Sequence, residues 1–156
     1  MGTAYSKRKS STRHEKLKVE EAIRPEVCIL GHSRVGKSYI ARYLSMSDFI
    51  IHDTEAYTDR NAYRDDIIAR SSIFILVFKL QDRYSFHQLH TISRHVKDLV
   101  SFNPSPTFII YATNEGYSPK VSQSEIESLC SELQAEYFTS AASLQLYLEI
   151  ATVYDY

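Results

Sequence analysis

The sequence predicts an α/β fold in which a parallel sheet of about five strands is flanked by helices. Two observations carry this prediction. Apolar runs of strand type alternate with segments of helical periodicity along residues 25–153. The run Ile73–Leu80 is almost continuously apolar and rich in β-branched and aromatic residues, as expected of a strand covered on both faces. The chain has 156 residues, 44% of them hydrophobic, which is enough for one domain with a buried core.

The first half of the chain supplies three expected strands and two expected helices. The apolar run Glu26–Leu30 predicts a buried strand that ends at Gly31. The segment Lys37–Ser45 gathers its apolar residues on one helical face. The elements expected after it are a strand at Asp48–His52, a helix at Arg60–Arg70 and the strand at Ile73–Leu80.

The second half continues the alternation. The segment Tyr84–Ser101 repeats apolar residues at spacings of three and four, which predicts a helix, and the prolines at 104 and 106 break the chain after it. Ser122 and Glu125 match a capping box, which opens a helix through about residue 135. The remaining expected elements are strands at Thr107–Ala112 and Tyr137–Ser140 and a helix at Leu144–Val153.

Charge divides the chain into two parts. Residues 1–24 hold seven Lys and Arg and three Glu, a net charge of +4, whereas the whole chain has a net charge of −1. We therefore expect a basic, flexible N-terminal arm over 1–24 and a domain over 25–156. The acidic body argues against nucleic-acid binding. The longest uninterrupted apolar run has six residues and there are two cysteines, which argues against a membrane span and a disulfide scaffold.

The segment between the first expected strand and helix satisfies the pattern G-x-x-x-x-G-K-[ST]. Its glycines allow the backbone to turn so that N–H groups point at phosphates, and its lysine adds a positive charge. The serine hydroxyl would bind Mg²⁺. We therefore expect a P-loop NTPase-type sheet, although a strand-to-helix turn without ligand is the alternative. The expected phosphate-binding residues are Gly31, Arg34, Val35, Gly36, Lys37 and Ser38.

With this loop, the order of elements over residues 25–153 resembles a Ras-superfamily small GTPase. The dipeptide Asp53-Thr54 resembles the start of that family's Asp-x-x-Gly motif. The stretches Leu80–Phe86 and Val121–Leu133 look closest to the branch of the Ras-related oestrogen-regulated growth inhibitor. The resemblance implies a signalling protein that binds GTP or GDP with Mg²⁺, in which Asp53 would hold the metal through a water and Ser38 would bind it directly.

Several family features are replaced. About eight residues separate Ser45 from Asp53, so the effector loop and the edge strand are expected to be absent. The strand before Asp53 would then pair directly with the phosphate-loop strand, giving the small G-protein fold minus one edge strand. Ala56 stands at the family's glycine and Tyr57 at its glutamine, which orients the attacking water. We therefore expect weak or absent GTP hydrolysis.

The base-reading motif is altered as well. The family's Asn-Lys-x-Asp reads Asn114-Glu115-Gly116-Tyr117 here, and a tyrosine cannot accept two hydrogen bonds from guanine as an aspartate does. The stretch 139–141 resembles the family's Ser-Ala-Lys loop, with a one-residue shift left open. The resemblance places Asn114, Ser140 and Ala141 near the base, with poor discrimination between guanine and adenine.

The first residues fit the N-myristoylation pattern M-G-x-x-x-[ST], with Gly2 as the acceptor and basic residues directly after it. One acyl chain with a polybasic patch would allow peripheral membrane contact through residues 2–9, and an ordinary soluble basic tail is the alternative. We expect a monomer located in the cytoplasm or at the inner face of the plasma membrane, with protein effectors or regulators still to be found.

Three functions remain open on the sequence. The first is a Ras-like, guanine-nucleotide-binding protein with slow turnover. The second is a pseudo-GTPase, an interaction module whose nucleotide site is vestigial. The third is a P-loop ATPase or kinase, which is weakest because no cluster of lid arginines is visible. A truncated or alternatively spliced product would also explain the missing segment.

Overall fold

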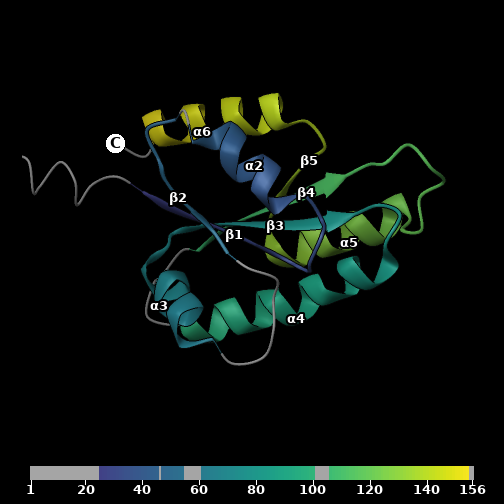
Figure 1. The fold of residues 1–156 in the computed structure, drawn as a ribbon, viewed down its shortest axis with the longest axis horizontal. Helices are drawn as coiled ribbons and strands as arrows, with labels where there is room; N and C mark the ends of the chain where they lie inside the picture. The colour runs from purple at the N-terminus through teal and green to yellow at the C-terminus, as the bar shows by residue number, and fades with distance from the viewer. Residues whose placement is uncertain (1–24, 46, 55–60, 101–105, 155–156) are drawn as a thin grey trace, which may run out of the picture.

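A central sheet of five parallel strands organises the molecule (Figure 1). The structure, a computed structural model, describes residues 25–45, 47–54, 61–100 and 106–154. The strand order is β2-β1-β3-β4-β5, and every neighbouring pair is parallel. The strands are β1 (Glu26–Gly31), β2 (Ile50–Asp53), β3 (Ile73–Lys79), β4 (Thr107–Thr113) and β5 (Glu136–Phe138). The predicted five-stranded parallel sheet is thus confirmed.

Helices cover both faces of this sheet. Figure 1 shows α2 and α6 on one face and α3, α4 and α5 on the other. The helices are α2 (Lys37–Leu44), α3 (Ala62–Arg70), α4 (Arg83–Leu99), α5 (Gln123–Leu133) and α6 (Ala141–Tyr154). Because strand side chains alternate between faces, the buried residues of β1, β3 and β4 belong to two separate hydrophobic clusters, one under each helical layer.

The central strand β3 supplies buried side chains to both faces of the sheet. Phe74, Leu76 and Phe78 of β3 point into the cluster under α3, α4 and α5, whereas Ile75 and Val77 point into the cluster under α2 and α6. All five side chains are fully buried. Burying side chains of this size stabilises the fold by roughly 1.5–3 kcal/mol each.

Most helices begin at a side-chain cap. Asn61, Asp82 and Ser122 each accept a hydrogen bond from the backbone N–H three residues later, at the starts of α3, α4 and α5. The capping box of Ser122 and Glu125 is present as predicted. Helix α2 has no side-chain hydrogen bond at its N-cap, Gly36. Its first N–H groups are therefore left for another acceptor.

Several expected boundaries were wrong by a few residues. Strand β2 begins at Ile50 rather than Asp48, and β5 ends at Phe138 rather than Ser140. Helix α6 begins at Ala141, three residues earlier than expected, because Ser140 accepts a hydrogen bond from the N–H of Ser143 and so caps it. Helix α5 ends at Leu133, where Gln134 adopts a left-handed conformation with φ of 52°.

At one edge of the sheet, β2 lies directly beside β1. Ile50 and Ile51 pair with Glu26 and Val27, and residues 45–49 connect α2 to β2. The opposite edge is β5, which pairs with β4. Among the helices that the structure describes, none is long and apolar enough to cross a membrane.

Candidate functional site

The phosphate loop runs from the end of β1 to the start of α2, and glycine is required at two places for different reasons. A Cβ on Gly31 would lie 2.5 Å from the carbonyl oxygen of Val77, so the close approach of β1 to β3 excludes any side chain there. Gly36 has φ of 101°, a left-handed conformation that favours glycine. The loop therefore depends on both motif glycines.

Lys37 folds back over the loop that precedes it. Its Nζ donates hydrogen bonds to the carbonyl oxygens of Gly31, at 2.8 Å, and His32, at 2.7 Å. The residue is buried, and burial lowers the pKa of its ammonium while the negative charge of Asp53 acts in the opposite direction. The ammonium is thus held at the loop by contacts within the motif itself.

A cavity of about 390 Å³ lies over this loop, lined by Ser33, Arg34, Val35, Gly36, Lys37, Ser38 and Thr54. The uncapped start of α2 belongs to its lining, and backbone N–H groups at a helix N-terminus attract anions. Thr54 is buried and donates to the carbonyl oxygen of Ile29, which holds the segment after β2 against β1. The buried lysine and the open N–H groups fit a phosphate chain.

The two predicted metal residues, Ser38 and Asp53, lie at or next to this cavity. Ser38 lines it, and Asp53 ends β2 one residue before Thr54. Among the described residues, no group of three or more His, Cys, Asp and Glu side chains is placed to hold a metal ion. A Mg²⁺ ion here would therefore need phosphate oxygens in addition to Ser38 and Asp53.

A second cavity, of about 410 Å³, adjoins the first. Its lining comes from the phosphate loop and from the carboxyl ends of the central strands, where parallel α/β sheets bind ligands. The lining residues are Arg34, Val35, Gly36, Tyr39, Lys79, Tyr111, Thr113, Asn114, Glu115 and Thr139. Arg34, Val35 and Gly36 line both cavities, so a ligand could extend from one into the other.

Arg34 is the residue at the junction of the two cavities. It is exposed, and its φ of 60° places it in the left-handed region without being a glycine. Such a conformation costs of order 1 kcal/mol for a residue with a side chain. Arg34 therefore contributes to the walls of both cavities, through a backbone conformation that has a cost.

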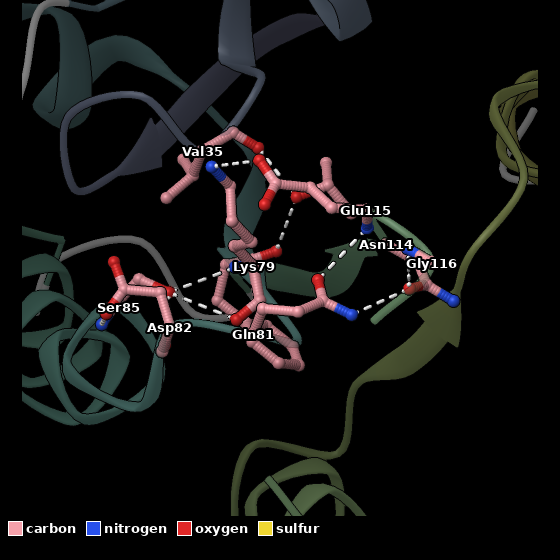
Figure 2. A network of polar contacts seen from close by, with 10 residues as sticks. Val35, Lys79, Gln81, Asp82, Ser85, Asn114, Glu115 and Gly116 are labelled. Atoms are coloured by element: carbon pink, nitrogen blue, oxygen red, sulfur yellow. Dashed lines mark hydrogen bonds and ion pairs between the residues drawn. The ribbon is translucent and has the colours of Figure 1, made fainter. Parts of the chain in front are cut away.

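A polar network lies at the ends of β3 and β4 (Figure 2), and its residues Asn114 and Glu115 also line the second cavity. Gln81 Nε2 donates to Asn114 Oδ1 at 2.8 Å and to the carbonyl oxygen of Tyr117 at 3.0 Å, and Gln81 Oε1 accepts from the N–H of Glu115. Asn114 Oδ1 also accepts from the N–H of Gly116. Asn114 thus braces this loop, and Gln81 ties the loop to the end of β3.

Two further contacts join the network to the phosphate loop. Thr113 Oγ1 donates to the carbonyl oxygen of Val35 at 2.9 Å and to that of Phe78 at 3.3 Å. Lys79 Nζ forms an ion pair with Glu115 Oε1 at 2.7 Å. The end of β4 therefore positions the phosphate loop, and the charge that the motif gains at Glu115 is balanced by Lys79.

Only some of the predicted base residues line the second cavity. Asn114 lines the second cavity. Thr139 lines it from the 139–141 stretch, whereas Ser140 caps α6 and Ala141 is buried in the core. Of the 139–141 stretch, Thr139 is thus the residue that lines the second cavity, and the base contacts of Ser140 and Ala141 stay predictions.

Other predicted residues lie outside the cavities or outside the described chain. Tyr117 is exposed and is absent from the second cavity's lining, while its carbonyl oxygen accepts from Gln81. Gly2, Ala56 and Tyr57 lie outside the described residues. Their roles stay predictions.

Sequence reasoning missed Lys79, Tyr39 and Tyr111 as cavity residues. Lys79 had a recognisable signal, since it is a charged residue at the carboxyl end of a buried central strand. Tyr111 is held by a hydrogen bond from its hydroxyl to the carbonyl oxygen of Thr139 at 3.3 Å, and burial raises the pKa of that phenol. Nothing in the local pattern around Tyr39 distinguishes it from an ordinary surface residue.

A scan against protein-family models finds one match, to the Ras family over residues 44–153. The chain belongs to the Ras family. The matched region begins at Leu44, so the phosphate loop lies outside it and is independent evidence. A search of curated proteins finds no match for the chain.

Family membership indicates which part of a nucleotide each cavity would hold. The chain is a small GTPase-type nucleotide-binding protein, and its family implies guanine nucleotide, typically bound with Mg²⁺. The first cavity fits the phosphates, because a buried lysine and an uncapped helix start meet there. The second cavity is the adjoining space in which a nucleoside would lie.

Proposed function

We propose that this chain binds guanine nucleotide weakly through its phosphate loop, hydrolyses it slowly or not at all, and presents nearly the same surface with GDP and with GTP. The observation that carries the proposal is the contrast between an ordered phosphate loop and an altered base loop. Lys37 belongs to the phosphate loop and is held on Gly31 and His32, whereas Tyr117 of the base loop does not line the cavity.

The phosphate contacts would come from Lys37 and the N–H groups at the start of α2, with Arg34 at the junction of the two cavities. Ser38 and Asp53 would hold Mg²⁺, which bridges phosphate oxygens and neutralises their charge. Asn114 and Thr139 line the second cavity and would contact the nucleoside. Ser140 and Ala141 would support this wall indirectly, because α6 begins there.

Slow turnover is supported by the short connection between α2 and β2. Only residues 45–49 separate α2 from β2, which supports the expected absence of an effector loop and of an additional edge strand before β2. Switching in such proteins depends on segments that the terminal phosphate orders. With this segment missing, and with Ala56 and Tyr57 in place of the family's glycine and glutamine, the water would be poorly positioned and the two nucleotide states would differ little.

A pseudo-GTPase that uses its surface for protein binding is the second candidate. The observation in its favour is that the side chain of Tyr117 does not line the cavity, so the base loop has lost its specific acceptor. The two candidates differ in whether the phosphate loop is occupied under cellular nucleotide concentrations.

A titration with fluorescent GDP, GTP and ATP analogues, with and without Mg²⁺, tests nucleotide binding. Lys37→Ala should abolish binding, since removing a buried charge partner from phosphate costs about 2–5 kcal/mol. Lys97→Ala, an exposed lysine on α4, is the matched control and should bind as the wild type does. Equal affinity of the wild type and the Lys37 variant would rule out the proposed site.

Single-turnover hydrolysis with excess protein tests the catalytic part. We expect a rate well below the intrinsic scale of ordinary small GTPases, roughly 10⁻⁴ s⁻¹. A rate at or above that scale would show that another residue positions the water.

We further infer that Gly2 is acylated and that residues 2–9 hold the protein at an anionic membrane, with the chain otherwise monomeric in the cytoplasm. The support is the sequence pattern and the basic residues directly after it. Incorporation of labelled myristate into the wild type and its loss in Gly2→Ala would test this, and equal labelling of the two would contradict it.

A further inference from the structure

The outer edge of β2 has no partner strand within the part of the chain that the structure describes. The strand order ends at β2, which lies beside β1 on its inner side alone (Figure 1). A free strand edge is a template on which another strand can form, and proteins commonly cover such an edge or protect it with lysine or proline. The strand β2 contains neither of these two residues, so its edge is suited to pairing.

The backbone groups that face outward follow from the pairing of β2 with β1. The N–H of Ile50 donates to the carbonyl oxygen of Pro25 at 3.2 Å, so the backbone of Ile50 is directed toward β1. Successive residues of a strand direct their backbone groups to opposite edges, and those of Ile51 and Asp53 therefore point outward. Ile50, Ile51 and His52 are half-buried, so the edge is open at its side chains as well.

The segment Lys16–Glu20 of the N-terminal arm has a sequence that fits this edge. Charged residues alternate in it with Leu17 and Val19, which is the period of two that a strand requires. A strand with this pattern buries one face and leaves its charged face in water. The arm therefore contains a short segment that can extend a sheet.

The arm is long enough to reach the edge. A strand formed by residues 16–20 on the outer side of β2 would run antiparallel to it, and residues 21–24 would then pass the start of β2 to reach Pro25. Neighbouring strands are about 4.8 Å apart, so the new strand would lie about 10 Å from β1. Four extended residues span up to about 13 Å, which is enough to cover this separation.

Side-chain chemistry selects one placement of this strand. Ile51 packs against the cluster under α2 and α6. The next residue, His52, points to the opposite face, where its Nε2 lies 3.5 Å from Glu26 Oε2. When Leu17 and Val19 lie beside Ile51, the two lysines of the segment lie on the face that carries the Glu26 carboxylate. Apolar and oppositely charged groups are thus matched by the same placement.

We propose that residues 16–20 form a sixth strand, antiparallel to β2, which covers the open edge of the sheet. The outward N–H and C=O groups of Ile51 and Asp53 pair with this strand, and its apolar side chains shield Ile51. The arm thereby supplies an edge strand from a different part of the chain than the short connection between α2 and β2. Residues 2–9 stay outside the pairing, so the proposed membrane contact is compatible with it. The inference goes beyond the proposed function and does not depend on nucleotide binding.

Hydrogen exchange of the full chain, read by mass spectrometry at single residues, tests the pairing. We expect the amides of Ile51 and Asp53 to be protected in the wild type. In the double variant Leu17→Asp with Val19→Asp the apolar face of the segment is lost, and exchange at both amides should become about tenfold faster or more, while β3 and β4 stay protected.

The matched control is the double variant Ser10→Asp with Thr12→Asp. It introduces the same charges at the same spacing in the arm but outside the proposed strand, and it should exchange as the wild type does.

Oxidative cross-linking gives a second readout of the same contact. Facing Cβ atoms of antiparallel neighbours lie about 4.5–5.5 Å apart. Of Leu17→Cys and Val19→Cys, each combined with Ile51→Cys, at least one should therefore form a disulfide within a single chain, identified by peptide mapping. The control combines Val19→Cys with Lys97→Cys, at an exposed position on α4, and should stay unlinked.

Three results would overturn the inference. The first is equal exchange at Ile51 and Asp53 in the wild type and in the double variant Leu17→Asp with Val19→Asp. The second is protection of these amides that rises with protein concentration, which would show that a second copy of the chain pairs with β2. The third is a disulfide that forms only between two chains.

Discussion

The two halves of the nucleotide site are built in different ways. The phosphate cavity comes mostly from one contiguous stretch, in which Lys37 bonds to residues five and six positions before it. The base cavity is assembled from the ends of several strands, and its link to the phosphate loop, Thr113 to Val35, spans 78 positions. A compact motif keeps or loses its function as a unit, whereas a dispersed site can exchange one group for another.

The charge exchange at the base cavity illustrates this difference. Glu115 reverses the charge of the family's lysine, and Lys79 supplies a positive charge from β3 at 2.7 Å. The phosphate loop offers no such freedom, because Gly31 has no space for a Cβ. The comparison predicts that substitutions in the phosphate half lower both the stability of the fold and the affinity for phosphate. Substitutions in the base half should change the affinity for the nucleoside and leave the affinity for phosphate unchanged.

Gly31→Ala should have the largest effect. The new Cβ would meet the Val77 carbonyl oxygen at 2.5 Å and Val35 Cγ2 at 3.1 Å, so β1 and β3 must separate. We expect a loss of about 3 kcal/mol in the free energy of unfolding, measured by urea denaturation, and loss of nucleotide binding. Gly116→Ala is the control in the base half. It has open space and a φ of 88°, so it should cost about 1 kcal/mol. Equal costs for the two variants would contradict the comparison.

Gln81→Ala should have an intermediate effect confined to the base half. It removes three hydrogen bonds that hold Asn114, Glu115 and Tyr117, and we expect a loss of about 1–2 kcal/mol of stability. Calorimetry should show weaker binding of GDP with unchanged binding of pyrophosphate. If pyrophosphate binding fell equally, the two halves would not be separable.

Ser140→Ala should have the smallest effect. Because Ser140 caps α6 through the N–H of Ser143, its loss should lower the free energy of unfolding by about 0.5–1 kcal/mol without changing the ratio of GDP to ADP affinity. Ser143→Ala, at an exposed position on the same helix, is the control. A changed ratio of GDP to ADP affinity in Ser140→Ala would show that Ser140 contacts the base, as the sequence predicted.

The sequence predicted most of the fold because periodicity and capping are local. The run at β3 and the Ser122–Glu125 capping box both appear where they were expected. The phosphate loop was predictable for the same reason, since its residues are contiguous. The base cavity was not, because the contacts of Gln81 with Asn114 and of Lys79 with Glu115 join strand ends that lie far apart in the sequence. The placement of Thr139 instead of Ser140 depended on the residue at which β5 ends, which periodicity alone cannot fix.

The central claim is that the phosphate half carries nucleotide binding and that the base half discriminates weakly. Competition of GTP, ATP and inorganic pyrophosphate against one fluorescent GDP analogue on the wild-type chain measures both parts at once. The account predicts that pyrophosphate competes and that GTP exceeds ATP in affinity by less than about a thousandfold, below what a dedicated polar reader achieves. A larger ratio, or displacement by GTP without any displacement by pyrophosphate, would contradict it.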